Sequence, residues 1–274
     1  MKIIDKEDLA KEITKIIVEA PVIAQKAKAG QFVVLVVDEK GERIPLTLAD
    51  WDREKGTITL IFQKVGFSTK RLGTLNSGDN IEHILGPLGH PTEIKNFGEI
   101  FSIGGGVGIV EVYPVSRVFK EAGNRIMGII GARSKDLIIL EDKMQKVCDE
   151  LFITTDDGSY GRAGFVTDIL KELLEVVEKS THTKYPALVY AIGPVPMMKA
   201  VSELTRNYGI KTIVSLNPIM VDATGMCGSC RCTVAGKSVF GCVDGPDFDA
   251  HQVDFEELAK RLKLFKNQEE NLKN

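Results

Sequence analysis

Short apolar or alternating runs fill the first 95 residues, and turn residues separate them. The runs lie at 13–18, 31–37, 57–62 and 81–85, and the turns lie at 29–30, 39–41, 55–56 and 77–79. Runs of this length, bounded by glycine and charged residues, are typical of antiparallel strands. We therefore predict a small antiparallel β-barrel over residues 1–96, with Trp51 in its packing.

Beyond residue 98, apolar strands alternate with longer helical patterns. Strands are predicted at 99–103, 125–130, 151–155, 187–192 and 212–216, and helices at 109–121, 135–146, 165–177 and 195–207. Such alternation predicts a parallel sheet with helices on both faces, which binds its ligands at the carboxyl ends of the strands. Residues 97–216 are therefore predicted to form an α/β domain.

The last part of the chain, 217–274, has a third pattern. It holds a cysteine-rich loop, a short hairpin around 235–237 and a charged helix from 254 to about 266. The predicted fold class is therefore β + α/β, with an N-terminal antiparallel barrel, a parallel-sheet domain and a small C-terminal loop and hairpin region.

Composition and charge narrow the possible partners. Hydrophobic residues make up 43% of the 274, which is enough for two cores, and the net charge of -3 offers no general attraction to nucleic acid or to an anionic membrane surface. Charged residues interrupt the N-terminus, and nowhere do eighteen apolar residues follow one another. We expect a cytoplasmic protein with neither a nucleic acid nor a membrane as partner.

Four of the five cysteines lie between 227 and 242. In a reducing compartment such a cluster indicates a site for a soft metal rather than disulfides. Zinc and iron-sulfur both remain possible at this point, because both take clustered thiolates. One tight group, Cys227, Cys230 and Cys232, followed by a distant Cys242 and without a histidine inside it, favours iron-sulfur.

A glycine run follows the first strand of the α/β part. The sequence continues as Gly104-Gly105-Gly106-Val107-Gly108 and enters an apolar helix. Glycines there let the backbone approach a phosphate, and the helix N-terminus presents free N–H groups to it. A tight turn without a ligand is the alternative, because an isolated glycine run has low specificity.

Residues that could contact a ligand also follow two later strands. Asp157 lies after the strand at 151–155, and Gly193, Pro194 and Met197 follow the strand at 187–192. A ligand lying across the carboxyl edge would meet all of these loops together. Asp157 could instead cap a turn.

The ordered set of strand-GGGxG, Gly-Ala-Arg133-Ser134 and GPxPMM resembles the nucleotide half of the ferredoxin-NADP reductase superfamily. The resemblance implies that the glycine loop holds the pyrophosphate, that Arg133 faces the adenosine end and that the Gly-Pro-Met turn borders the nicotinamide. Many members have a cysteine where this chain has Ile192. Local chemistry does not separate NAD from NADP, because Arg133 suits a 2′-phosphate and Asp136 opposes one; the resemblance favours NAD(H).

The same resemblance implies FAD in the barrel. Its motif, an arginine followed by Ser or Thr, is matched by Arg43, Pro45, Leu46 and Thr47. Arg43 would pair with the diphosphate and Thr47 would bond the reactive edge of the flavin. The spacing is one residue longer than the usual form, and the usual aromatic residue is missing.

A second segment, Gly66, Ser68 and Thr69, offers N–H and O–H donors to phosphate. Its alternative role is to cap a helix, which is a common use of Ser and Thr. The segment lies between the Arg43 motif and residues 86–89, which also resemble the flavin domain of the superfamily, and this placement favours phosphate binding.

Nicotinamide, flavin and cluster sites in one chain imply an electron relay. Nicotinamide gives two electrons as a hydride, an iron-sulfur cluster accepts one at a time, and a flavin does both. We therefore predict a flavin and iron-sulfur oxidoreductase subunit with no catalytic side chain of its own.

The spacing ligand-x4-Cys-x2-Cys-x11-Cys resembles the electron-transfer subunits of dihydroorotate dehydrogenase, which carry FAD and a [2Fe-2S] cluster. The chain is similar along nearly its whole length to the small subunits of NADH-dependent ferredoxin:NADP oxidoreductases, which use an aspartate with three cysteines. That resemblance implies Asp222, Cys227, Cys230 and Cys242 as ligands. An all-cysteine set that includes Cys232 is the alternative.

The resemblance also implies a cytoplasmic heteromeric enzyme in which a larger flavin and iron-sulfur subunit performs electron bifurcation. The alternative within the enzyme class is the electron-transfer subunit of a dihydroorotate dehydrogenase. A different class is a zinc-stabilised, nucleotide-binding regulatory protein without redox chemistry.

Overall fold

A computed structural model describes residues 1–179 and 185–264 of the chain. Contacts divide these residues into two units. The barrel unit holds Met1–Thr92, Leu216–Pro246 and the part that starts at Asp254, and the sheet unit holds Glu93–Ser215 and Asp247–Val253. The C-terminal part, predicted as a segment of its own, is therefore shared between the two units.

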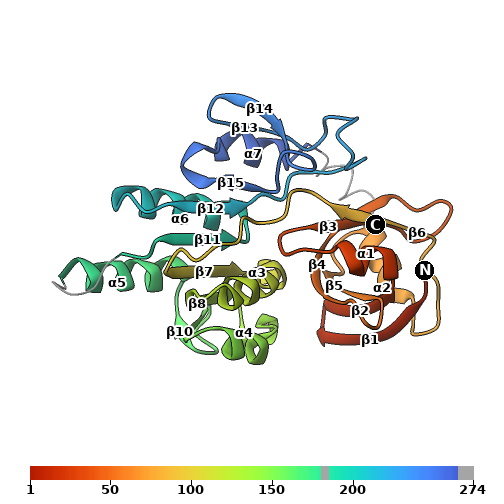
Figure 1. Ribbon diagram of the computed structural model, residues 1–274, viewed down its shortest axis with the longest axis horizontal. Coiled ribbons are helices and arrows are strands. Elements are labelled where there is room, and N and C mark those ends of the chain that lie inside the picture. Colours follow the sequence, from red (N-terminus) through yellow and green to blue (C-terminus); the bar gives the residue numbers. More distant parts are fainter. Residues whose placement is uncertain (180–184, 265–274) are drawn as a thin grey trace. The chain divides into compact units, whose positions relative to one another are not determined.

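The barrel unit is built on an antiparallel sheet (Figure 1). Its strands are β1 (Ile3–Ala10), β2 (Ile13–Glu19), β3 (Phe32–Val36), β4 (Arg43–Asp52), β5 (Thr57–Gln63) and β6 (His83–Leu88), in the spatial order β1-β2-β5-β4-β3-β6. A bridge between Lys2 and Asn80 joins the start of β1 to the segment before β6. The predicted barrel is thus confirmed, and helices α1 (Pro21–Lys26) and α2 (Phe67–Thr74) complete this part.

The two faces of β3 have different partners. Val33 and Leu35 are fully buried in the barrel core, against which Trp51 also packs. Phe32 and Val34 point to the opposite face, since successive strand residues alternate. There they form a separate buried cluster with Cys230 and Cys242 of the C-terminal part. The cysteine segment therefore packs on the outer face of the barrel.

The C-terminal part of the barrel unit contains a hairpin and a helix. The hairpin pairs β13 (Arg231–Val234) with β14 (Lys237–Phe240), as the sequence predicted, and α7 (Phe255–Arg261) contacts β13. The side chain of Asp254 caps α7 by accepting from the N–H of Glu257 at 2.9 Å. The predicted helix end near 266 lies outside the described residues.

The sheet unit contains a mainly parallel sheet with the strand order β10-β9-β8-β7-β11-β12-β15. Its strands are β7 (Glu99–Gly105), β8 (Arg125–Ala132), β9 (Glu150–Thr155), β10 (Arg162–Ala163), β11 (Leu188–Ile192), β12 (Thr212–Ser215) and the antiparallel β15 (Asp247–Asp249). Its helices are α3 (Ile109–Glu121), α4 (Glu141–Val147), α5 (Val166–Lys179) and α6 (Val195–Asn207), with short 3-10 helices η1 (Gly106–Gly108), η2 (Lys135–Leu137) and η3 (Ala250–Gln252).

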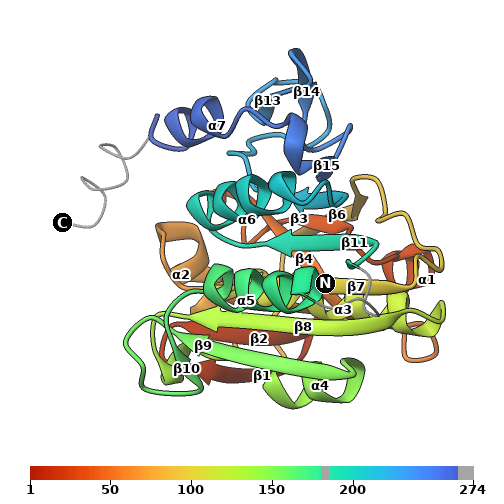
Figure 2. The same ribbon diagram turned by 90° about the vertical axis from the view of Figure 1, so that its left-hand side faces the viewer.

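The chain reverses its direction across this sheet beside β7. From β7 it moves through β8 to β9, and it then returns to add β11 and β12 on the other side of β7. Helix α3 packs with α4, and α5 packs with α6 (Figure 2). The strand order therefore has a topological switch point between β7 and β11, where sheets of this kind bind their ligands.

One predicted helix differs from the structure. Residues 135–146 are not a single helix, because η2 ends at Leu137 and α4 begins only at Glu141. Leu140 has a left-handed backbone with φ of 57°, which interrupts any continuous α-helix. Buried Ile139 anchors the connection. In the described residues, no helix combines the length and apolar character needed to span a bilayer.

Candidate functional site

The glycine loop lies at the switch point of the sheet unit. Gly104 and Gly105 end β7, and Gly108 precedes α3. A methyl group at Gly108 would lie 2.4 Å from the carbonyl oxygen of Ile192, and one at Gly105 would lie 2.4 Å from Sδ of Met197. Close packing between the two loops that follow β7 and β11 is therefore one reason for these glycines.

Gly106 differs from its neighbours. Its φ is +56°, and a methyl group there would meet no atom within 4 Å. Loop packing does not account for a glycine with open space around it. The left-handed backbone and the adjacent N-terminus of α3 leave room for a phosphate to approach the main chain.

Gly193 and Pro194 follow β11, and Pro194 occupies the N-cap position of α6 without a capping side-chain hydrogen bond. A methyl group at Gly193 would lie 2.7 Å from Cε of Met197 and 3.1 Å from Cα of Gly105. The structure thus brings together the glycine loop and the Gly-Pro-Met turn, which are about 90 positions apart in sequence.

Arg133 and Asp157 follow β8 and β9, and both are exposed. The Asp157 carboxylate accepts from the N–H of Ser159 at 2.9 Å, and hydrogen bonds from Ser159 hold the pKa of Asp157 below its usual range. Asp157 therefore has the turn-capping contact that was its alternative role. The guanidinium of Arg133 has no ion-pair partner among the residues that the structure describes, so it is available to an anionic ligand.

Sequence reasoning missed a buried carboxylate in this region. Glu111, in the first turn of α3, is buried and accepts from the hydroxyl of Ser215 at 2.6 Å. This contact connects the start of α3 with the end of β12. A glutamate within the otherwise apolar run 109–115 was the available signal.

The predicted flavin residues of the barrel unit lie along β4. Arg43, Pro45 and Thr47 share one face of the strand, while Ile44 points into the barrel core and Leu46 packs against it. The partners of Thr47 and Pro45 on β3 are Phe32 and Val34, which contact the cysteine segment. The outer face of β4 is therefore continuous with the surface that carries Cys230 and Cys242.

The second flavin segment has the helix-capping contact that was its alternative role. Thr69 caps α2, because its Oγ1 accepts from the N–H of Gly66 at 3.1 Å. Ser68 instead donates its hydroxyl to Glu42 at 3.0 Å, directly before β4. That contact brings the Gly66 segment and the Arg43 motif together, although they lie in different parts of the sequence.

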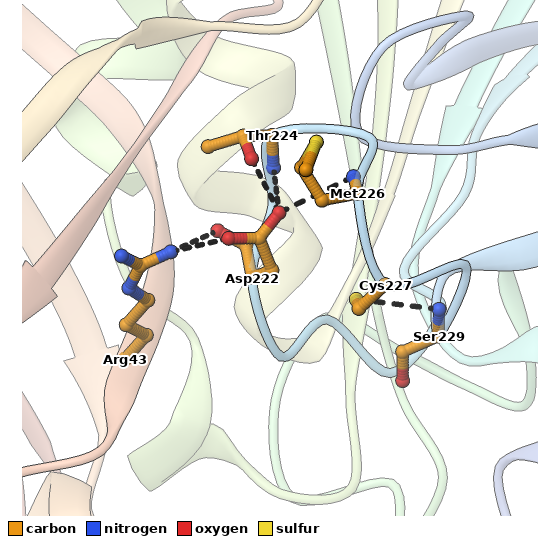
Figure 3. Close-up of polar contacts among 6 residues, drawn as sticks. All are labelled: Arg43, Asp222, Thr224, Met226, Cys227 and Ser229. Carbon is orange, nitrogen blue, oxygen red and sulfur yellow. Dashed lines mark hydrogen bonds and ion pairs between the residues drawn. The ribbon is translucent and has the colours of Figure 1, made fainter.

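Asp222 orders the cysteine loop (Figure 3). Its Oδ2 accepts from the N–H of Thr224 at 3.1 Å, from the Thr224 hydroxyl, and from the N–H of Met226 at 3.3 Å. The hydrogen bond from the Thr224 side chain is the main reason that the pKa of Asp222 lies below its usual value. The loop bends sharply, since Ala223 and Gly225 have φ of 62° and 87°.

Three cysteine side chains lie in and beside this loop. Cys230 and Cys242 are buried with their Sγ atoms 3.2 Å apart, and they are free thiols rather than a disulfide. Cys227 is exposed, and its Sγ accepts from the N–H of Ser229 at 3.5 Å. Backbone hydrogen bonds lower the pKa of Cys227, whereas burial raises that of Cys242 to about 12.

Cys232 has a different environment. It lies on β13, is fully buried and is absent from the cluster that contains Cys230 and Cys242. Burial raises its pKa to about 11, and its electrostatic neighbours are first Cys230 and then groups that include Glu257 and Arg261 of α7.

Two arginines hold the cysteine loop, and sequence reasoning missed both contacts. Arg43 donates from Nη1 to Asp222, reaching Oδ1 at 2.5 Å and the backbone oxygen at 2.9 Å. Arg261 donates from Nη2 to the backbone oxygen of Ser229 at 3.1 Å. No sequence signal predicts either pair, because 179 and 32 positions separate the partners.

The chemistry of the donor set fits an iron-sulfur cluster. Thiols and a carboxylate lie within one short segment, and a peptide N–H points at the Cys227 sulfur, as is common around cluster ligands. Among the described residues, no three His, Cys, Asp or Glu side chains are already close enough together to hold a single metal ion. Cys227 lies apart from the buried pair of thiols.

A family model and individual relatives all connect the chain with the same family of proteins. Residues 217–254 match the family model described as the iron-sulfur cluster binding domain of dihydroorotate dehydrogenase B. The chain is 44% identical, over 98% of its length and 92% of the relative, to the dihydroorotate dehydrogenase B (NAD(+)) electron transfer subunit homolog of Thermotoga maritima. It is 30% identical, over 90% of its length and 95% of the relative, to the corresponding subunit of Fusobacterium nucleatum.

A solved structure agrees with these sequence matches. The fold superimposes with a TM-score of 0.91 on a chain of the NADH-dependent reduced ferredoxin-NADP oxidoreductase, whose structure was described for its insights into flavin-based electron bifurcation. The two chains are 43% identical, and the match covers 98% of this chain and 95% of the other. Together these matches place the chain in the family of dihydroorotate dehydrogenase B electron transfer subunits and their homologues.

Proposed function

We propose that the chain is an electron-transfer subunit that passes electrons between NAD(H), FAD and a [2Fe-2S] cluster within a heteromeric NADH-dependent ferredoxin:NADP⁺ oxidoreductase. The observation that carries the proposal is the full-length match, at 43% identity and a TM-score of 0.91, to a chain of such an enzyme. The proposed partner is a larger flavin and iron-sulfur subunit that performs the bifurcation, and NAD(H) is the small-molecule substrate. We place the complex in the cytoplasm, because a reducing compartment keeps clustered thiols available for a metal centre.

The nucleotide site is proposed at the switch point of the sheet unit. Gly104, Gly105, Gly106 and Gly108 would bring the main chain and the N-terminus of α3 to the pyrophosphate. Arg133 and Asp157 would face the adenosine end, and Gly193, Pro194 and Met197 would border the nicotinamide. The open space at Gly106 supports this assignment.

The flavin site is proposed on the outer face of β4. Arg43 would hold the diphosphate with Gly66, Ser68 and Thr69, and Thr47 would bond the flavin ring. Pro45 and Leu46 would shape the strand between them. The flavin, when bound, converts a two-electron hydride into single electrons. The shared face of Arg43, Pro45 and Thr47 supports this assignment.

The proposed cluster ligands are Asp222, Cys227, Cys230 and Cys242. The short Sγ–Sγ distance between Cys230 and Cys242 supports these two as neighbouring ligands. The absence of Cys232 from the buried cluster that holds Cys230 and Cys242 supports leaving it out of the set. The bound cluster would accept one electron at a time.

A second candidate is the electron-transfer subunit of a dihydroorotate dehydrogenase. The match of residues 217–254 and the similarity to dihydroorotate dehydrogenase B electron transfer subunits favour it. The two candidates predict different partners, so affinity purification of the tagged chain from its own cells separates them. A large flavin and iron-sulfur subunit supports the first, and a dihydroorotate-oxidising subunit supports the second.

The absorption spectrum and metal content of the anaerobically purified chain test the redox assignment itself. Flavin bands with a broad visible shoulder, and two irons per chain, are expected for FAD with a [2Fe-2S] cluster. A colourless protein with stoichiometric zinc would refute the redox function and support the zinc-stabilised regulatory protein instead.

A further inference from the structure

Arg43 connects two parts of the barrel unit that the sequence assigns to different cofactors. It is the first residue of β4, the strand of the proposed flavin site, and it contacts Asp222, a proposed cluster ligand (Figure 3). One nitrogen, Nη1, makes both contacts, at 2.5 Å to Oδ1 and 2.9 Å to the backbone oxygen. The Arg43 side chain therefore holds both the carboxylate and the backbone carbonyl of Asp222.

Holding Asp222 also holds the loop. The other carboxylate oxygen, Oδ2, accepts from Thr224 and Met226 and so fixes the turn that leads to Cys227. That turn contains Ala223 in the left-handed region, a conformation that a residue with a side chain adopts only when its surroundings enforce it. Fixing both oxygens of Asp222 provides such enforcement.

The guanidinium has unused donors. It carries five N–H bonds in a planar fork, and the two on Nη1 match the two acceptors of Asp222. Within the described part of the chain, Nε and Nη2 have no hydrogen-bond partner, and the Arg43 side chain is 45% exposed. Its three remaining N–H bonds can reach an anion, and diphosphate is an anion that this fork geometry suits.

We propose that Arg43 is a positioning residue for the cluster-ligand loop, and that a single guanidinium bridges Asp222 and the flavin diphosphate. The proposal rests on the function proposed above. One side chain that serves both sites links them thermodynamically, so binding at either site changes affinity at the other by the same factor.

The test compares Arg43→Ala and Arg43→Lys with a matched control, Arg71→Ala. Arg71 pairs with Asp38 at 2.5 Å and its side chain is 43% exposed, so its ion pair resembles that of Arg43 in length and exposure. It does not contact the cysteine loop. The full-length holoprotein of each variant is assayed for FAD dissociation, for the EPR g-values of the dithionite-reduced cluster and for the rate at which an iron chelator bleaches the cluster.

Arg43→Ala is expected to lose FAD faster, to shift the EPR g-values and to bleach about threefold to tenfold faster, the range for the loss of partly screened charge-assisted hydrogen bonds. Arg43→Lys keeps the charge without the fork, so its values should fall between those of Arg43→Ala and the wild type. The control should match the wild type in all three measurements.

EPR and bleaching behaviour identical to the wild type in both Arg43 variants would overturn the proposal, and would leave Arg43 with a flavin contact alone. If Arg43→Ala fails to fold, as judged by its thermal midpoint, Arg43→Lys decides the question with the same measurements. A wild-type protein that binds neither iron nor FAD would instead refute the proposed function, so the two failures are distinguishable.

Discussion

Substitution of Gly106 by alanine tests the nucleotide site with little interference from packing. Its φ of +56° costs an L-residue about 1–2 kcal/mol, whereas the added methyl group would meet no atom within 4 Å. The free energy of unfolding should fall by about that amount, which corresponds to roughly 2–8 °C in Tm for a chain of this size. Urea unfolding measures this cost.

A matched control exists in the same unit. Gly209 has φ of +63° and equally open surroundings, so Gly209→Ala should carry the same backbone cost. It precedes β12 and therefore lies at the amino edge of the sheet, opposite the carboxyl ends where the nucleotide is proposed to bind. A difference in NADH binding between Gly106→Ala and Gly209→Ala therefore reflects where the methyl group lies, because the backbone cost of alanine is the same at both sites.

The expected difference is large. A methyl group at Gly106 occupies space that the pyrophosphate needs to approach the backbone, so the Kd for NADH should rise about tenfold or more, equivalent to about 1.4 kcal/mol. Gly209→Ala should bind NADH as the wild type does. Stopped-flow bleaching of the flavin at varied NADH concentration measures the Kd for NADH of both variants. Equal Kd values in the two variants would refute the placement of the pyrophosphate at this loop.

Three further substitutions test other contacts. Gly108→Ala should destabilise the sheet unit by about 1–3 kcal/mol in urea unfolding, because its methyl group would lie 2.4 Å from the backbone carbonyl of Ile192; unchanged stability would contradict this packing. Cys232→Ala should retain two irons per chain in metal analysis while Cys242→Ala loses them, and the reverse result would assign Cys232 as a ligand. Arg261→Ala should speed chelator bleaching of the cluster, since it frees a loop carbonyl; wild-type kinetics would exclude a holding role.

The sequence predicted elements best where apolar periodicity was strong. Helices α3 and α6 begin and end at the predicted residues, because 109–121 and 195–207 are long segments flanked by glycine or proline. Strand β1 was missed. Only Ile3 of its eight residues is fully buried and half of them are exposed, because β1 lies at the end of the strand order with β2 as its neighbouring strand.

Short strands depended on tertiary pairing rather than on local pattern. β15 has three residues and β10 has two, which is too few for any periodicity to be visible. β15 joins the edge of the parallel sheet by pairing with β12, and so carries 247–253 away from the rest of the C-terminal part. A division of the chain into consecutive segments could not assign residues 247–253 to the sheet unit and the residues on both sides of them to the barrel unit.

Motif order predicted the residues of the candidate sites, but it predicted none of their mutual contacts. Glycine runs and clustered cysteines are visible in the local sequence, so they predict backbone turns and candidate metal ligands without knowledge of the fold. The contact between Arg43 and Asp222, by contrast, depends on how the outer face of the barrel meets the cysteine loop. Such a contact follows from the fold and has no signature in either segment.

An anaerobic NADH titration of the purified chain, followed by absorption, tests the central claim most directly. Electrons that enter at the nicotinamide site should bleach the flavin bands and then the visible shoulder of the cluster, with about three electrons per chain at full reduction, two for FAD and one for [2Fe-2S]. Flavin bands that NADH leaves unchanged, or an intact visible shoulder after the flavin is reduced, would contradict a relay through these three sites.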